Sequence, residues 1–295
     1  MQYRKTIGER IFDWGNVLLM LAVLTITLYP FLHILAISFN EARDAAAGGI
    51  GIWPRVFSMD SYETVLGFPN IFNAMTVSVM RTLIGTLLSL IVSSAAAFAL
   101  MDKDMRGYGG IYKFFVISMF ISSGLIPTFI LYMNLGLYDS FLVYILPACF
   151  SVFNMILFRT YMMQLPHELS ESALIDGAGD FRIYAQIIMP LCLPIIATLA
   201  LFVAVNQWNS WRDTLFFTKS ESLETLQFVM MKIIRQAEAT TMVKRARTTL
   251  RPTISVTPES IKMAITIIAT LPILMVYPFV QRFFVKGMVI GAVKG

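Results

Sequence analysis

Residues 183–211 read IYAQIIMPLCLPIIATLALFVAVNQWNSW, a long run without a single Asp, Glu, Lys or Arg. A helix needs about 20 apolar residues to cross the roughly 30 Å hydrocarbon core of a bilayer. Similar charge-free runs occur on both sides of this one. We therefore predict an all-α membrane protein with a single transmembrane domain over residues 1–295 and six spans, at about 14–40, 72–101, 114–138, 140–158, 183–211 and 263–281.

The composition agrees with a membrane protein. Of the 295 residues, 57% are hydrophobic and 14% are charged, and the mean hydropathy is +0.71. A soluble domain carries about 25% charged residues, so a soluble globular protein is excluded. Cys149 and Cys192 lie in apolar runs, which argues against a disulfide framework. Residues 1–13 lack a small-residue cleavage site, and we expect the first span to be retained.

The distribution of basic residues predicts the orientation. Six spans place both termini on one side, and the loops on that side are rich in Lys and Arg. The opposite short loops hold only Arg43 and Arg55, with Arg81 at the membrane boundary. The positive-inside rule then places both termini in the cytoplasm. The extracytoplasmic segment 212–262, with nine basic and five acidic residues, argues the other way, but long segments count for less in that rule.

The sequence carries no pattern of an enzyme or a metal protein. It has no phosphate-binding P-loop, and its two histidines, His33 and His167, have no partners at metal-ligand spacing. We therefore expect no catalytic residue, metal or cofactor in this chain. The net charge of +5 does not indicate nucleic acid, because the basic residues border apolar spans. An ion-coupled secondary transporter is a weaker alternative, since carboxylates are missing from the span centres. A membrane-embedded enzyme and an anchoring scaffold are further alternatives.

The connection between the fourth and fifth spans, residues 164–190, reads QLPHELSESALIDGAGDFRIYAQIIMP. We predict a short helix that ends near Asp176, because Gly177 and Gly179 permit backbone angles that other residues resist. Such a helix at the membrane surface, joined to a spanning helix, can transmit a movement of a soluble partner protein to the spanning helix. The alternative is a plain amphipathic connecting helix.

The chain should then turn sharply into the fifth span. Asp180 is suited to cap the next helix. Pro190 and Pro194 should bend that helix where the span begins.

This connection resembles a known motif. Glu171-Ser-Ala173, three residues, Gly177, nine residues and Ile187-x-Met-Pro190 resemble the EAA motif of the membrane subunits of bacterial ABC importers, whose pattern is Glu-Ala-Ala, Gly and Ile-x-Leu-Pro at the same spacing. The departures at Ser172 and Met189 leave the helix and the turn intact. The resemblance implies a type I ABC importer permease fold in which residues 167–179 form the cytoplasmic coupling helix. It assigns coupling to the ATPase to Glu171, Ser172, Ala173, Asp176, Gly177 and Ala178.

The resemblance covers nearly the whole chain. The pair Trp208-Asn209, the run 258–264 and the tail 277–295 are similar to the carbohydrate-importer branch that includes the second membrane subunit of the maltose importer. They are also similar to the subgroup named for lipoprotein-linked and complex-polysaccharide permeases, with an alginate importer subunit as one candidate. By this resemblance Lys294 and Gly295 contact the ATPase, and a frayed tail is the alternative.

The resemblance also implies the assembly. A homologous second permease subunit would complete the pathway in membrane lipid, two ABC ATPase subunits would bind ATP and Mg, and an extracytoplasmic solute-binding protein would deliver an oligosaccharide. No nucleic acid is expected as a partner. A permease subunit of an ABC importer for a non-sugar solute remains the alternative.

Two features bear on the substrate. The basic residues of 212–262, including the cluster 244–247, suggest steering of an acidic, uronate-containing oligosaccharide such as an alginate or pectin fragment. A solvated amphipathic hairpin is the alternative.

Sugar sites combine aromatic faces with hydrogen-bonding groups, although a Trp at this depth is commonly an interface anchor. On chemistry alone the candidate pathway residues are Asn154, Asn206, Gln207, Trp208 and Asn209.

Overall fold

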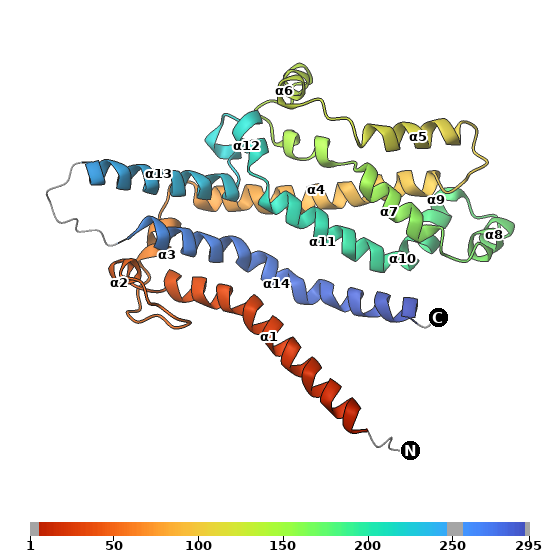
Figure 1. The fold of residues 1–295 in the computed structure, drawn as a ribbon. Coiled ribbons are helices and arrows are strands. Elements are labelled where there is room, and N and C mark those ends of the chain that lie inside the picture. The colour runs from red at the N-terminus through yellow and green to blue at the C-terminus, as the bar shows by residue number, and fades with distance from the viewer. Residues whose placement is uncertain (1–5, 247–255, 293–295) are drawn as a thin grey trace. The chain divides into compact units, whose positions relative to one another are not determined.

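The computed structural model describes residues 6–246 and 256–292, and this part of the chain is almost entirely helical (Figure 1). Its only β pairing among the described residues is an isolated antiparallel bridge between Asn40 and Phe57. The helices fall into two compact units. Unit 1 comprises Met1–Pro69 and Met230–Leu271, and unit 2 comprises Asn70–Val229 and Pro272–Gly295.

Unit 1 contains a long apolar helix, α1 (Ile7–Ser38). The helix begins with a capping box, in which the Thr6 hydroxyl accepts from the Glu9 N–H and the Glu9 carboxylate accepts from the Thr6 N–H. No residue in its most apolar stretch is buried, which fits a helix surrounded by lipid. The unit also contains α2 (Ala42–Ala46), α3 (Asp60–Leu66), most of α13 (Leu226–Ala246) and the first part of α14 (Pro258–Ala292).

The loop after α1 is held by the side chain of Asn40, which is 1% exposed. Its carbonyl oxygen accepts from the N–H groups of Arg55 and Val56, at 2.7 and 2.9 Å, and its amide donates to Asp44 at 2.8 Å. The hydrogen bond from Asn40, followed by the Arg55 guanidinium, holds the pKa of Asp44 below its usual value. This network fixes the loop and leaves Ile52 exposed on it.

Unit 2 is organised by α4 (Ile71–Ala99), which lies along α7 (Val152–Met162) and α11 (Leu193–Asn209) (Figure 1). The short helices before α7 are α5 (Tyr108–Ser118), α6 (Leu125–Asn134), η1 (Phe141–Tyr144) and η2 (Leu146–Ala148). Those after α7 are α8 (Glu168–Ile175), α9 (Asp180–Arg182), the π-helical segment η3 (Ile183–Ile188), α10 (Met189–Leu191), α12 (Arg212–Phe217) and η4 (Glu221–Leu223).

By length and composition, three helical stretches of the described chain can cross a membrane: Ile7–Ser38, Ile71–Ala99 and Pro258–Phe279. The number rises to five if each of two bent pairs is one span. One pair is Phe141–Ala148 with Val152–Met162, bent by 43°, and the other is Asp180–Leu191 with Leu193–Asn209, bent by 81°. These five stretches overlap five of the six predicted spans.

The remaining predicted span, 114–138, corresponds to two shorter helices. Helix α5 ends at Ser118, and α6 begins only at Leu125. Between them Gly124 has a φ of +78°, a conformation that favours glycine and ends regular helix. The Gly124 carbonyl accepts from the Thr128 hydroxyl at 2.7 Å. Helix α6 alone has 10 residues, about half of what a crossing requires.

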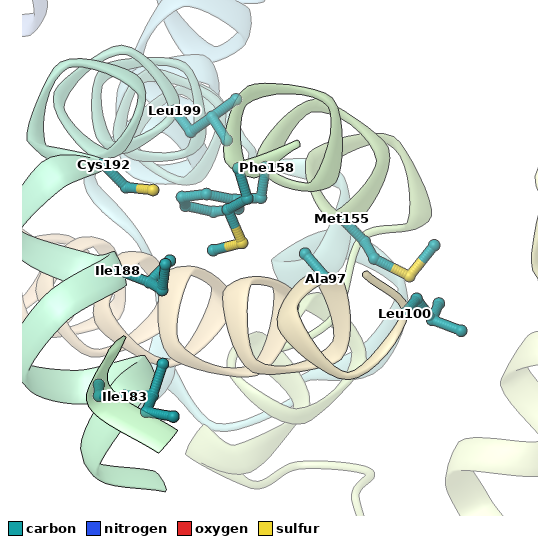
Figure 2. Close-up of a cluster of buried hydrophobic side chains, with 10 residues drawn as sticks. Ala97, Leu100, Met155, Phe158, Ile183, Ile188, Cys192 and Leu199 are labelled. Carbon is teal, nitrogen blue, oxygen red and sulfur yellow. The ribbon is translucent and has the colours of Figure 1, made fainter. Parts of the chain in front are cut away.

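The main hydrophobic core of unit 2 joins α4, α7, η3 and α11 (Figure 2). Phe158 points from α7 toward Cys192 in Figure 2, and neither side chain is exposed. The same cluster includes Ala173 of α8. Hydrophobic packing therefore ties the short surface helix to the long apolar ones. Cys149 and Cys192 are both free thiols.

A tight turn precedes η1, and Gly136 and Asp139 in this turn both have positive φ angles. Asp139 ties this turn to the segment after α12. One of its carboxylate oxygens accepts from the N–H groups of Lys219 and Ser220 at 2.8 Å, and the other accepts from the Ser220 hydroxyl at 2.6 Å. The hydroxyl bond from Ser220, followed by these two N–H bonds, holds the pKa of Asp139 below its usual value.

This carboxylate makes stability depend on pH. Because the folded-state pKa of Asp139 is lowered, its stabilisation is complete above the usual value of about 3.9 and is lost as the pH falls through the folded-state pKa. We expect the unfolding temperature in detergent to fall as the pH drops below about 4. Asp139→Asn should flatten that decline, and Ser220→Ala should flatten part of it. Identical pH profiles for wild type and Asp139→Asn would contradict this assignment.

Candidate functional site

The predicted short helix of 167–179 is present as α8, from Glu168 to Ile175. Gly177 ends it with a φ of +82°. The Gly177 N–H donates to the Leu174 carbonyl at 3.0 Å, and the Ala178 N–H donates to the Ala173 carbonyl at 2.9 Å. These two bonds form a Schellman motif, which satisfies the last carbonyls of the helix. The glycine therefore stops the helix as the sequence predicted.

The expected cap at Asp180 is wrong. Gly179 occupies the N-cap position of α9 in an extended conformation, and no side chain caps this helix. Asp180 is instead the first helical residue. The Schellman turn ends at Ala178. The extended residue that precedes α9 is therefore Gly179, one position before Asp180.

Helix α8 buries one side and exposes a mixed surface on the other. Ala173 is 9% exposed and packs in the main core, whereas Leu174 and Ile175 are 55% and 87% exposed. Glu171 and Asp176 are also exposed. Exposed apolar side chains bordered by polar ones mark protein-interaction surfaces. A neighbouring protein could therefore bind α8 through apolar contacts flanked by carboxylates.

The chain between α8 and α11 is not entirely regular α-helix. Residues Ile183–Ile188 form a π-helix, a rare conformation that is frequent at functional sites. The Tyr184 hydroxyl lies 2.8 Å from the Ser94 hydroxyl of α4. The predicted bend then follows, with 81° between Asp180–Leu191 and Leu193–Asn209.

A second group of polar residues surrounds Arg81 on α4, whose side chain is 3% exposed. Its Nε donates to Gln207 Oε1 at 2.8 Å, and its Nη1 donates to the Ser210 carbonyl at 3.2 Å. Its Nη2 pairs with the Asp213 carboxylate. The guanidinium carbon lies 4.6 Å from the centre of the Tyr144 ring. Arg81 thus joins α4 to η1 and to both ends of the connection between α11 and α12.

Two further contacts hold this group in place. The Tyr144 hydroxyl donates to the Leu223 carbonyl at 2.7 Å, and the Tyr144 carbonyl accepts from Gln207 Nε2 at 3.4 Å. Gly85 on α4 gives Gln207 room, because a Cβ there would lie 2.6 Å from Gln207 Nε2. The glycine permits the close approach of α11 to α4.

Sequence reasoning treated Arg81 only as a residue at the membrane boundary. A basic residue within an apolar span usually has a partner, and that rule marks Arg81 as a candidate for function. It does not identify Asp213, which lies 132 positions away in the chain.

A cavity of about 510 Å³ adjoins the Arg81 group. Three predicted pathway residues, Asn154, Asn206 and Gln207, share its wall. The other lining residues are Arg81, Ser89, Ala148, Phe150, Ser151, Phe153, Phe202, Val203, Ser210 and Asp213. Aromatic, amide and hydroxyl groups in one wall suit a carbohydrate.

The other predicted pathway residues lie elsewhere. Asn209 lines a neighbouring pocket of about 470 Å³, which Asn206 also lines. Trp208 lines a separate apolar pocket of about 180 Å³ between α4, α11 and the second part of α14. The structure therefore does not bring all five predicted pathway residues into one cavity.

The remaining sequence predictions concern the C-terminal tail, the basic cluster, the histidines and metal binding. Lys294 and Gly295 lie outside the described residues, as do the side chains of the basic cluster 244–247. His33 contacts the Gly51 carbonyl at 3.0 Å. Within residues 6–246 and 256–292, no group of three or more His, Cys, Asp or Glu side chains could hold a metal ion.

Comparison with known proteins identifies the family. No family model matches the chain. The chain is 38% identical to Protein LplC of Bacillus subtilis (strain 168) over 291 residues, 98% of this chain and 97% of the relative. It is 35% identical to the polygalacturonan/rhamnogalacturonan transport system permease protein YtcP of the same organism over 293 residues, 97% of this chain and 99% of the relative.

A solved structure supports the same assignment. It is a crystal structure of a bacterial ABC transporter involved in the import of the acidic polysaccharide alginate, with a TM-score of 0.81 and 26% identity over 96% of this chain and all of that chain. The near-complete matches in sequence and fold, together with the apolar helices, establish that the chain is a transport subunit rather than an enzyme and belongs to the family of sugar ABC transporter permeases.

Proposed function

We propose that this permease is the transmembrane subunit of an ATP-driven, binding-protein-dependent importer that moves an oligosaccharide across the bacterial cytoplasmic membrane. The observation that carries the proposal is α8, an exposed helix closed by a Schellman motif and anchored through Ala173 in the core of the apolar helices. Such a helix transmits a movement of a soluble partner without performing chemistry.

The proposed topology has six spans in a type I arrangement, with both termini in the cytoplasm. Helices α5 and α6 together would account for the third span, and residues 212–262 would face the extracytoplasmic side. Helix α8 would be the cytoplasmic coupling helix. A homologous second permease subunit, two ABC ATPase subunits with ATP and Mg, and an extracytoplasmic solute-binding protein would complete the importer.

The packing of α8 suggests how coupling works. Ala173 and Ala178 pack in the same cluster as Met162 of α7 and Ile183 of η3. Because packed cores rearrange between discrete states rather than deform continuously, a shift of α8 would move α7 and η3 with it. Closure of the ATPase subunits would in this way change the arrangement of the helices that line the cavity.

We further propose a uronate-containing oligosaccharide, such as a pectin or alginate fragment, as the substrate. The named substrates of YtcP and of the alginate transporter, both similar to this chain over nearly its whole length, support this class. The aromatic and amide groups of the 510 Å³ cavity support a sugar more generally.

Co-purification tests the proposal. Gentle detergent extraction of the tagged chain, followed by mass spectrometry, should recover an ATPase and a second permease subunit, and uptake should require ATP. Ile175→Asp on the exposed end of α8 should reduce ATPase recovery several-fold, because it places a charge in the apolar contact. Ile52→Asp, which changes an exposed isoleucine on the loop after α1, is the matched control. Recovery of the chain alone, with uptake that survives ATP depletion, would contradict the proposal.

A further inference from the structure

We infer that Asp213 is the group through which this chain binds hydroxyl groups of the transported sugar, and that Arg81 is the positioning residue that fixes it. The inference rests on the proposed function and adds a binding residue and its chemistry to it. The ligand at this position is a sugar unit that presents neighbouring hydroxyl groups, rather than a carboxylate, to the wall of the cavity.

The two members of the ion pair differ in exposure. The Arg81 side chain is 3% exposed, whereas that of Asp213 is 34% exposed. Arg81 is enclosed by Gln207, the Ser210 carbonyl, Asp213 and the Tyr144 ring. A molecule entering the cavity therefore has far more access to the carboxylate than to the guanidinium.

Asp213 also keeps hydrogen-bonding capacity for a ligand. Its Oδ2 accepts from both Arg81 and the Ser210 hydroxyl, the latter at 2.9 Å. Its Oδ1 accepts no hydrogen bond from any residue in the described part of the chain. An ionised carboxylate only accepts hydrogen bonds, and each of its oxygens has about two lone pairs, so Oδ1 alone can accept from a pair of neighbouring donors. Two neighbouring sugar hydroxyls are such a pair, and their bonds to a carboxylate are charge-assisted.

The charge of this wall also favours hydroxyl groups. The charges of Arg81 and Asp213 cancel, and the more exposed member is negative. A substrate carboxylate at this position would meet a like charge, which opposes binding. If the substrate carries uronates, its hydroxyl edge faces Asp213 and its carboxylates point away from this wall. Asn154 and Asn206 supply amide groups in the same cavity.

The experiment must separate contact with the sugar from the structural role of Asp213 as the partner of Arg81. Asp213→Asn alone would leave Arg81 buried without its counterion, so the comparison is made in an Arg81→Gln background. Uptake of radiolabelled trigalacturonate and of galactotriose is measured with the complete importer. Chain levels and ATPase assembly are measured in parallel. Glu63→Gln, an exposed carboxylate on α3, is the matched control.

Arg81→Gln should lower uptake about threefold, and adding Asp213→Asn should lower it about tenfold further, the loss expected for one hydrogen bond to a charged group. A purely structural Asp213 predicts no further loss once Arg81 is absent. Equal uptake by Arg81→Gln and the double variant would overturn the inference. The proposed function is tested separately by the wild-type importer. If it takes up galactotriose but not trigalacturonate, the uronate substrate is wrong, and the ranking of the variants with galactotriose still tests Asp213.

Discussion

Replacing Gly177 by valine is expected to lower uptake at least tenfold while the amount of chain in the membrane stays the same. A Cβ at this position would meet nothing within 4 Å, so a steric clash is not the cause. The cause is the φ of +82°, which costs an ordinary L-residue about 1–2 kcal/mol and is worse for a β-branched one. Relief of that strain would break the Schellman motif and change the angle between α8 and the α9 helix that follows it.

Gly177→Asn is the matched control, because asparagine tolerates this conformation better than other residues. We expect it to keep most of the uptake. Gly177→Asp should uncouple transport, because it adds a negative charge beside the negative end of a helix dipole and on the surface proposed for the ATPase. The measurements are substrate uptake, membrane level of the chain and substrate-stimulated ATP hydrolysis. Normal uptake by both the valine and the aspartate variants would refute the coupling assignment.

Asp213→Ala should lower the free energy of unfolding of the chain by about 3 kcal/mol. The variant leaves the Arg81 guanidinium buried at 3% exposure without a counterion. Removal of one partner of a buried ion pair costs about 3–5 kcal/mol, and the lower end applies because Asp213 is itself one-third exposed. The effect should appear as a lower unfolding temperature in detergent.

The double variant Arg81→Met/Asp213→Leu is the control. It removes both charges and replaces them with apolar side chains, so it should recover most of the lost stability. If Asp213→Ala unfolds at the wild-type temperature, Asp213 does not neutralise Arg81 in the folded protein. Comparison of the single and double variants thus measures the cost of the unpaired charge rather than that of the lost contacts.

The turn after α8 could be predicted because its cause is local. Gly177 needs only its own backbone freedom to end the helix, and the residues around it supply the rest. The break between α5 and α6 was missed because an absence of charge from 114 to 138 says nothing about whether the helix is continuous. Gly124 was the available sign, but a glycine within an apolar run is also compatible with an unbroken helix.

The kinds of chemical group that line the cavity could be predicted from the sequence, but the positions of these groups could not. Asn154 and Asn206 were chosen for their amide groups and share one wall. Trp208, chosen for its aromatic face, lies in a different pocket, because neighbouring residues in a helix point about 100° apart. The pairing of Arg81 with Asp213 depends on how distant helices pack, and no local pattern in the sequence contains that information.

The number of residues in the π-helical segment η3 affects the direction in which the cavity residues of α11 point. A π-turn holds more residues than an α-turn, since its hydrogen bonds run from i to i+5. Each additional residue in a helix rotates everything after it by about 100°. The side of α11 that carries Asn206 and Gln207 is therefore set in part by how many residues lie between Gly179 and Cys192. Loss of one residue from Ile183–Ile188 would turn these amides away from the cavity without changing any side chain that lines it.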